Sequence, residues 1–278
     1  MRKQVHLPAK FCKPLWKSAV IFSIMVLIYK EEGKSMEQQT TTKRIWEIDF
    51  LRGLLIPGMI LIHLVYDVTV LYRLADWRWP WWYVLLQYNY GALFVALSGV
   101  SVTLGSRCVR RGLTVLAWGM VCTAVTAGMY LLGMADRGVL IYFGVLHCIG
   151  VCMLLWPVFR RCPVWGLALI GLAMAVAGQY LRYQTFDTAY LVVLGFQFPG
   201  FSSSDYFPLL PNLGYFLLGA AVGRGLYRNK HSLLDHVDQT RYPIRVLTCW
   251  GRHSLMIYLL HQPVLALVCQ GIVWIRKL

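Results

Sequence analysis

The sequence predicts an all-α fold, a polytopic transmembrane helix bundle of about seven spans, and its composition is the main reason. Hydrophobic residues make up 58% of the 278 residues, charged residues only 14%, and the mean hydropathy is +0.56. Soluble proteins are typically about 45–50% apolar and about 25% charged. The chain therefore has too few charges to cover a water-facing surface. In lipid, a helix satisfies its backbone polar groups within one segment, so we expect helices in a lipid bilayer.

Apolar segments alternate with short charged connections from Glu47 onward, and each is long enough to cross about 30 Å of hydrocarbon. We predict spans near residues 48–72, 81–104, 112–133, 139–159, 164–181, 206–227 and 253–275. Residues 188–205 are also apolar, but Pro199, Gly200 and three serines interrupt them. This stretch is too short to span, and we expect it to dip into the membrane or to cap a cavity.

The distribution of basic residues predicts the orientation. If the segment before the first span is cytoplasmic, twelve basic residues lie inside and six lie outside. The positive-inside rule favours this arrangement, and we expect a multi-pass protein of a bacterial cytoplasmic membrane. The aromatic run 77–83 then forms an anchoring belt at the outer interface. Because topology accounts for the basic loops, we expect no nucleic acid partner.

Residues 1–35 differ from the rest of the chain. Five basic residues precede an apolar run over 18–29, which is short for a span and is typical of a signal-type segment. Alternatively, Lys30–Gly33 can be encoded by a purine-rich stretch that resembles a bacterial ribosome-binding site, which would place the start at Met36. We expect residues 1–35 to be a dispensable extension and residues 36–278 to form the transmembrane domain.

The eight cysteines show no disulfide framework, and most lie in or beside apolar segments. We interpret them as small buried hydrophobic residues. Cys148 and Cys152 flank one helical turn beside His147, but no second ligand pair accompanies them. We therefore predict no metal.

A polar stripe marks the first predicted span. At about 100° per residue, Asp49, Arg52, His63 and Asp67 fall within an arc of roughly 60°. Charged side chains within spans normally face a bundle interior or an aqueous cavity, so the stripe is expected to line one. His63 is too deep to reach the interface, and Asp67 lies one turn beyond it. A carboxylate at that spacing can orient an imidazole and raise its basicity, as a general base requires.

A purely structural interpretation stays open for part of this pattern. Asp49 and Arg52 lie near the cytoplasmic end, where an arginine can reach the interface and pair with a carboxylate. Polar groups at comparable depth in other spans are either structural or functional. They are Asn89, Ser98, His147, Arg252, His253, Ser254, Tyr258, His261 and Gln262.

Four stretches resemble the heparan-alpha-glucosaminide N-acetyltransferase-like catalytic domain family, within the transmembrane acyltransferase superfamily. They are Ile48–Gly53 followed by His63, Ala96–Ser101, Asp205–Pro211 leading to Gly219, and Gly251–Pro263. They occur in the expected order between about Arg44 and Val268. The chain is much shorter than the eukaryotic lysosomal enzyme, so the resemblance does not carry over that enzyme's glucosamine acceptor.

The resemblance implies transfer of an acetyl or other acyl group from cytosolic acyl-CoA to a sugar or glycan across the membrane. It assigns His63 the catalytic role and Arg52 a part in donor binding. We expect Arg252 and Asp49 to complete the donor site and Asp67 to orient His63. The remaining candidates for the acceptor or oxyanion are Asn89, His147, Tyr258, His261 and Gln262. Acetyl-CoA is the default donor, and a homodimer would be common for such proteins.

A proton-coupled transporter or flippase is the alternative, because it too would place acidic, basic and histidine side chains along a helix that faces a cavity. Such proteins often contain internal repeats, and the two halves of this sequence show no convincing repeat. A transporter would move its substrate without cleaving a thioester.

Overall fold

The computed structural model describes residues 45–133, 136–187 and 190–276. The predicted extension over residues 1–35 and the alternative start at Met36 lie outside these residues. Within them the fold is all-α, as the composition predicts. The helices are α2 (Trp46–Tyr66), α3 (Trp81–Leu104), α4 (Cys108–Leu131), α5 (Val145–Phe159), α6 (Val164–Leu181), α7 (Leu209–Leu226), α8 (Tyr242–Arg252) and α9 (Ser254–Ile275). A π-helical turn, Asp67–Leu71, extends α2.

Each predicted span overlaps one helix, whereas α8 lies outside all of them. Among the residues that the structure describes, five helical segments are long and apolar enough to cross a membrane: Trp46–Leu71, Trp81–Leu104, Cys108–Leu131, Val164–Leu181 and Ser254–Ile275. The fourth predicted span begins too early, because residues 139–144 do not continue as α-helix and α5 has only 15 residues. α5 is thus a short apolar helix.

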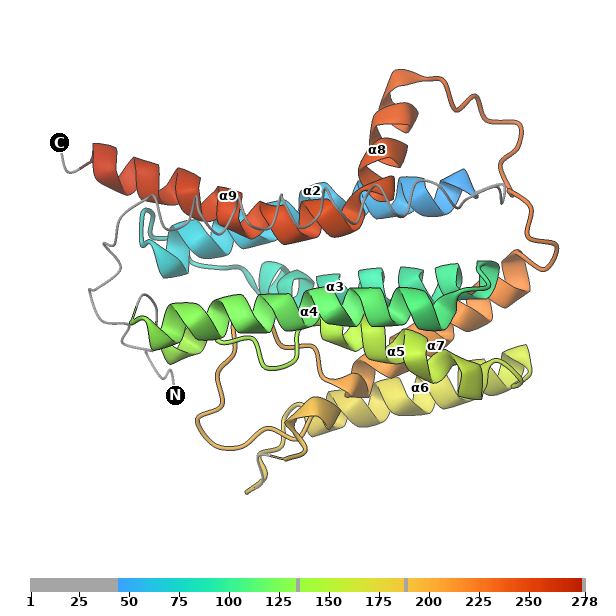
Figure 1. Ribbon diagram of the computed structural model, residues 1–278, viewed down its shortest axis with the longest axis horizontal. Coiled ribbons are helices and arrows are strands. Elements are labelled where there is room, and N and C mark those ends of the chain that lie inside the picture. The colour runs from blue at the N-terminus through green and yellow to red at the C-terminus, as the bar shows by residue number, and fades with distance from the viewer. Residues whose placement is uncertain (1–44, 134–135, 188–189, 277–278) are drawn as a thin grey trace.

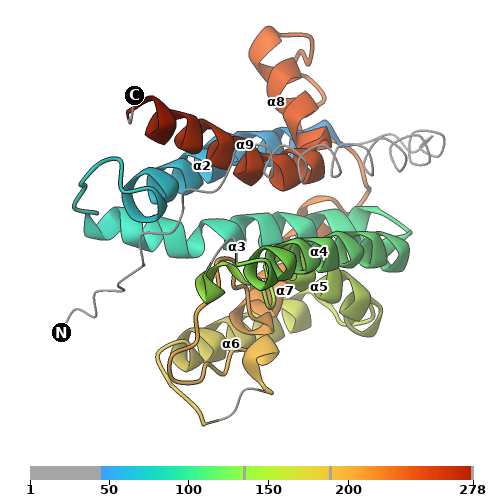
Figure 2. The ribbon, with the colours of Figure 1, turned by 60° about the vertical axis from the view of Figure 1, so that its left-hand side comes forward.

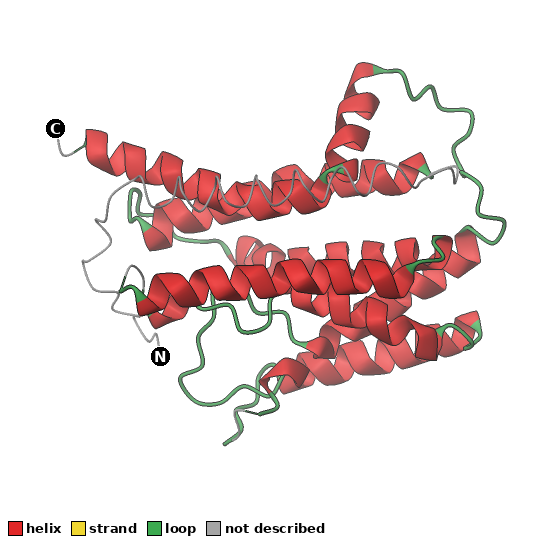
Figure 3. Ribbon diagram, in the orientation of Figure 1, coloured by secondary structure: helices red, strands yellow, loops and turns green. Residues whose placement is uncertain are grey.

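The helices form layers that run roughly parallel to one another. α2 and α9 lie together on one side, α3 and α4 lie next to them, and α5, α6 and α7 complete the opposite side (Figure 1). Figure 3 shows the long loops that connect α6 to α7 and α7 to α8. In both Figures 1 and 2, α8 runs crosswise to α2 and α9. α2 runs along the bundle from one end to the other (Figure 1).

Glycines allow the closest helix crossings. A Cβ atom on Gly99 would collide with the carbonyl group of Phe216, and one on Gly219 would collide with that of Ala96. These contacts hold α3 directly against α7. Small residues commonly bring membrane helices together in this way, because apolar burial gives little drive for association in lipid. The packing leaves α2 and α9 as a separate wall opposite α3 and α4.

Candidate active site

A large cavity of about 2450 Å³ runs along the whole length of α2. Its lining includes Ile45 at the start of that helix and Tyr72 beyond its π-helical end. The other walls come from α3, α4, α5, α9, the ends of α6 and α7 that face the cavity, and the loops before and after α7. All four polar residues of the predicted stripe on α2 line this cavity, as their helical spacing predicts.

His63 lies on the cavity wall with a defined proton arrangement. Its Nδ1 atom is 2.9 Å from the carbonyl oxygen of Met59, one turn earlier on α2. Because a carbonyl oxygen only accepts hydrogen bonds, Nδ1 must be the donor. In the neutral ring, Nε2 therefore carries the lone pair. The ring is thus arranged to accept a proton at Nε2.

A second histidine packs against the first. The rings of His63 and His261 meet edge to face with their centroids 4.7 Å apart. His261 Nδ1 is 2.5 Å from the carbonyl oxygen of Tyr258, so this ring is also protonated at Nδ1 when neutral. Its buried Nε2 atom has no hydrogen-bond partner in the part of the chain that the structure describes. A neutral His261 therefore presents a lone pair and cannot donate from Nε2 to an oxyanion.

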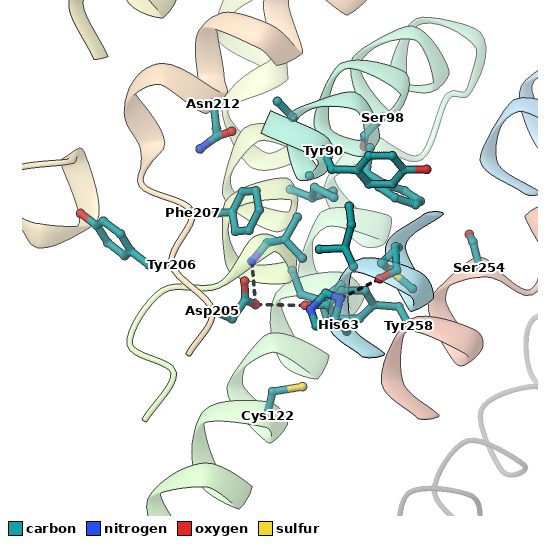
Figure 4. A pocket seen from close by; sticks show the side chains of 18 of the residues that line it. His63, Tyr90, Ser98, Cys122, Asp205, Tyr206, Phe207, Asn212, Ser254 and Tyr258 are labelled. Atoms are coloured by element: carbon teal, nitrogen blue, oxygen red, sulfur yellow. Dashed lines mark hydrogen bonds between the residues drawn. The ribbon is translucent and has the colours of Figure 1, made fainter. Parts of the chain in front are cut away.

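Asp205, in the loop before α7, joins three parts of the site. Its Oδ2 atom accepts hydrogen bonds from the Tyr258 hydroxyl at 3.0 Å and from the Val145 amide at 3.1 Å. Figure 4 shows Asp205, Tyr258 and His63 grouped on one side of the cavity. The loop lies outside the membrane-spanning helices, and burial there raises the pKa of the Asp205 carboxyl. Local sequence patterns did not mark Asp205 as a site residue, although it opens the stretch Asp205–Pro211 that resembles the family.

Asp67 has a different partner from the one expected. The Gln262 side-chain amide lies 3.1 Å and 3.2 Å from its two carboxylate oxygens. Asp67 is fully buried and begins the π-helical turn. Its hydrogen bonds therefore connect α2 to α9, whereas the Met59 carbonyl orients His63. The expectation that Asp67 orients His63 directly is corrected, because the carboxylate points to the neighbouring helix.

The charged residues at the start of α2 form a small cluster. Asp49 lies 3.7 Å from Arg52 and 3.6 Å from Arg252, the last residue of α8. Arg52 also donates to the Ser101 hydroxyl at 2.7 Å. The three residues predicted for the donor site are thus brought together. Ser101 belongs to the stretch Ala96–Ser101 that resembles the family, and its contact with Arg52 places it beside the cluster.

Hydrogen bonds to Glu47 hold the loop after α7 at the same end of the cavity. Glu47 Oε1 accepts hydrogen bonds from Ser232 Oγ at 2.6 Å and from the amides of Leu233 and Leu234 at 2.6 Å and 3.0 Å. Lys230 and His231, which precede these residues, line the cavity. Glu47 therefore places additional basic side chains near the Asp49 cluster, a role that its position in the sequence did not indicate.

Two of the proposed acceptor or oxyanion residues are occupied by structural contacts. His147 lies behind the cavity wall: its Nδ1 accepts from the Gly144 amide at 3.2 Å, and its Nε2 is 3.2 Å from Thr123 Oγ1. These bonds fix the start of α5, so the expectation that His147 belongs to the site is corrected. Asn89 does line the cavity, and one amide hydrogen is donated to the Leu85 carbonyl at 2.8 Å. A side-chain amide has two donor hydrogens, so Asn89 retains one.

Comparison with known proteins identifies one matching family model. The model described as "Heparan-alpha-glucosaminide N-acetyltransferase, catalytic" matches residues 44–263. This range contains His63, Asp205 and both arginines of the Asp49 cluster. No curated protein and no solved structure matches the chain.

Proposed function

The chain belongs to the heparan-alpha-glucosaminide N-acetyltransferase catalytic family, and on that premise we propose that it transfers an acetyl or other acyl group from cytosolic acyl-CoA to a sugar or glycan across the membrane. Membership makes the protein a transferase of the acetyltransferase type. Its apolar helices make it a multi-pass membrane protein. The donor, the acceptor, the cytoplasmic orientation of the α2 start and the bacterial cytoplasmic membrane are parts of the proposal.

One observation carries the proposal: a single cavity connects a cationic end with an opposite polar end, and His63 lines it in between. Arg52 and His63 are eleven residues apart on α2, which corresponds to about 16 Å along the helix. Donor and acceptor can therefore enter from opposite ends and meet at the imidazole. A continuous passage is what transfer across a membrane requires.

The cationic end suits the phosphates of acyl-CoA. Arg52 and Arg252 are held by Asp49, and Arg107, Arg110 and Arg111 line the same cavity. Guanidinium groups bind phosphates through short, charge-assisted hydrogen bonds. In our proposal, Arg52 and Arg252 bind the phosphates while Asp49 positions both side chains. The thin pantetheine arm then carries the thioester toward His63.

The opposite end suits a polyhydroxylated acceptor. Asp76, Trp79 and Gln197 line the cavity there, which combines hydrogen-bonding groups with an aromatic ring. An acceptor hydroxyl or amine would lose its proton to His63 Nε2 as its oxygen or nitrogen attacks the thioester carbonyl. The carbon–sulfur bond then breaks, and the imidazolium returns the proton to the leaving thiolate. The products are the acylated acceptor and free CoA.

The developing oxyanion needs a hydrogen-bond donor. Of the predicted donors, Tyr258 donates to Asp205 and neutral His261 presents a lone pair. The amides of Gln262 and Asn89 each use one hydrogen, toward Asp67 and the Leu85 carbonyl, and each retains a second one on the cavity wall. We therefore assign the oxyanion to these two amides. We also propose direct transfer rather than an acyl-histidine intermediate, because His63 can serve as the base without further rearrangement.

The test is thioester cleavage by the purified protein. The wild-type protein and His63→Ala are incubated with acetyl-CoA, with glucosamine or glucose as amine or hydroxyl acceptor, and free CoA is measured. His236→Ala is the matched control, because His236 is exposed and does not line the cavity. We expect CoA release from the wild type and the control, and at least a hundredfold loss in His63→Ala, in the range of a lost general base. Normal turnover in a folded His63→Ala protein would contradict the proposal.

The same assay separates the transport alternative. A cavity that extends along the whole length of α2 would also serve a transporter or flippase. Such a protein would move its substrate while acetyl-CoA stays intact. Family membership favours the transferase.

A further inference from the structure

Helix α8 has a position that the proposed reaction does not explain. It comprises Tyr242–Arg252 and runs crosswise to the bundle helices (Figures 1 and 2). Its 11 residues extend about 16 Å, roughly half the hydrocarbon thickness, so it cannot span the membrane. The chain bends at His253, and α9 then begins as one of the apolar helices long enough to cross. α8 therefore projects sideways from the α2 and α9 side of the bundle, immediately before a span (Figures 1 and 2).

One face of α8 packs tightly against the first turns of α2. A Cβ atom on Gly251 would collide with the backbone of Asp49, and Gly53 faces the backbone of Leu247 equally closely. Thr248 is buried on the same side. The contact fixes α8 at the level of the Asp49 cluster, near the start of α2 and not at mid-bundle.

The remaining surface of α8 combines exposed aromatic rings with arginines. Tyr242 is 80% exposed and Trp250 is 41% exposed. Arg241, just before the helix, and Arg245 are exposed as well. Aromatic side chains with a polar edge and arginines with long apolar stems are the residues that favour the membrane–water interface.

Charge identifies the partner. Between residues 236 and 252 the sequence contains three arginines and one acid, Asp238. Arg252 pairs with Asp49, and Asp238 lies close enough to Arg241 to interact with its charge, so Arg241 and Arg245 together leave this surface with one net positive charge. Basic amphipathic helices that lie in the membrane plane bind anionic lipids through such side chains.

We propose that α8 is an in-plane interfacial helix that binds anionic phospholipid headgroups through Arg241 and Arg245, with Tyr242 and Trp250 inserted at the headgroup level. This inference stands apart from the acyl transfer reaction, because neither arginine lines the cavity. It needs only the membrane location of the bundle.

Lipid retention provides the test. Wild-type protein, Arg241→Gln/Arg245→Gln and the matched control Arg160→Gln/Arg161→Gln are exchanged into vesicles of phosphatidylcholine with phosphatidylglycerol, and the retained phosphatidylglycerol is counted by mass spectrometry. The control removes two exposed arginines from the connection between α5 and α6, which lies at the same end of the bundle (Figure 1). We expect the α8 variant to bind phosphatidylglycerol about tenfold or more weakly, and the control to match the wild type.

Two outcomes would overturn the proposal: unchanged lipid retention in the α8 variant, or equal losses in both variants. If unchanged retention were accompanied by loss of a dimer, this surface would be assigned to a second copy of the chain. A second measurement applies if the α8 variant does not fold. A diazirine-bearing phosphatidylglycerol is photolysed with the wild-type protein, and its attachment sites are mapped. Labelling within residues 241–250 is expected, and labelling confined to other segments would contradict the proposal.

Discussion

His63 and Asp205 illustrate how single side chains acquire different tasks in this membrane protein. His63 is anchored by its own helix and presents Nε2 on the cavity wall. Asp205 is surrounded by donors, because Tyr258 and Val145 both point at the same carboxylate oxygen. The first arrangement leaves a lone pair for chemistry, whereas the second holds α5, α9 and the loop before α7 together.

Replacing Asp205 tests the second arrangement. Asp205→Ala would leave the Tyr258 hydroxyl and the Val145 amide without their acceptor, so we expect a loss of about 2–4 kcal/mol in stability. Asp205→Asn keeps one oxygen acceptor and should lose less. The measurement is the unfolding temperature in detergent, with the exposed Asp187→Asn as control. If the Asp205→Ala protein were as stable as the wild type, the carboxylate would not stabilise the packing of α5, α9 and the loop before α7.

The Asp67–Gln262 pair makes a different prediction, because its two residues come from α2 and α9. If the hydrogen bonds carry the effect of both side chains, Asp67→Ala and Gln262→Ala will not be additive. We expect the double variant to be less impaired than the sum of the single variants by about 1–3 kcal/mol. The measurement is a double-mutant cycle on unfolding, and additive effects would contradict the pairing.

At the level of elements, close helix crossings determine which walls the cavity has. α3 and α7 approach through Gly99 and Gly219, and α2 approaches α8 through Gly53 and Gly251. A side chain larger than hydrogen at these points would push backbones apart and would move Arg52 or Ser101, which line the cationic end.

Gly99→Ala tests the close crossing of α3 and α7, and Gly128→Ala is its matched control. An added Cβ at Gly99 meets the Phe216 carbonyl, whereas one at Gly128 meets nothing within 4 Å. We expect Gly99→Ala to lower the unfolding temperature by several degrees and Gly128→Ala to leave it unchanged or raise it slightly, since alanine favours helices. Equal behaviour of the two variants would refute the close crossing.

Helical periodicity made part of this structure predictable. The stripe of Asp49, Arg52, His63 and Asp67 depends only on 3.6 residues per turn, and all four side chains line the cavity. The spans follow from apolar length in the same way. The start of α5 could not be predicted from apolar length. It is set by the contact of His147 with Gly144 and by the carboxylate of Asp205, which is distant in the sequence.

Contacts between elements account for what local patterns could not provide. Asp67 is one turn from His63 in the sequence, but Gln262 comes close enough only when α9 packs beside α2. The role of Glu47 likewise requires the loop after α7 to fold back on the start of α2. α8 is short and amphipathic, so it could not be predicted from the length of apolar segments.

On the scale of the whole molecule, the cationic end of the cavity predicts which kinetic constant changes when donor binding is weakened. Arg252→Gln removes one guanidinium from the Asp49 cluster without touching the His63 region. We expect the KM for acetyl-CoA to rise about tenfold or more with little change in kcat, because the lost contact is to the donor phosphates and not to the reacting atoms. Arg161→Gln, which is exposed and does not line the cavity, is the control. A fall in kcat alone, at constant KM, would contradict this assignment.

The central claim is that one passage brings a donor and an acceptor from opposite sides to His63. Its most direct test uses proteoliposomes with glucosamine and glucose trapped inside and radiolabelled acetyl-CoA supplied outside. The account predicts labelled sugar in the lumen for protein oriented with the start of α2 outside, and none for His63→Ala. Luminal labelling by His63→Ala at the wild-type rate, or labelling only of sugar added on the same side as acetyl-CoA, would contradict it.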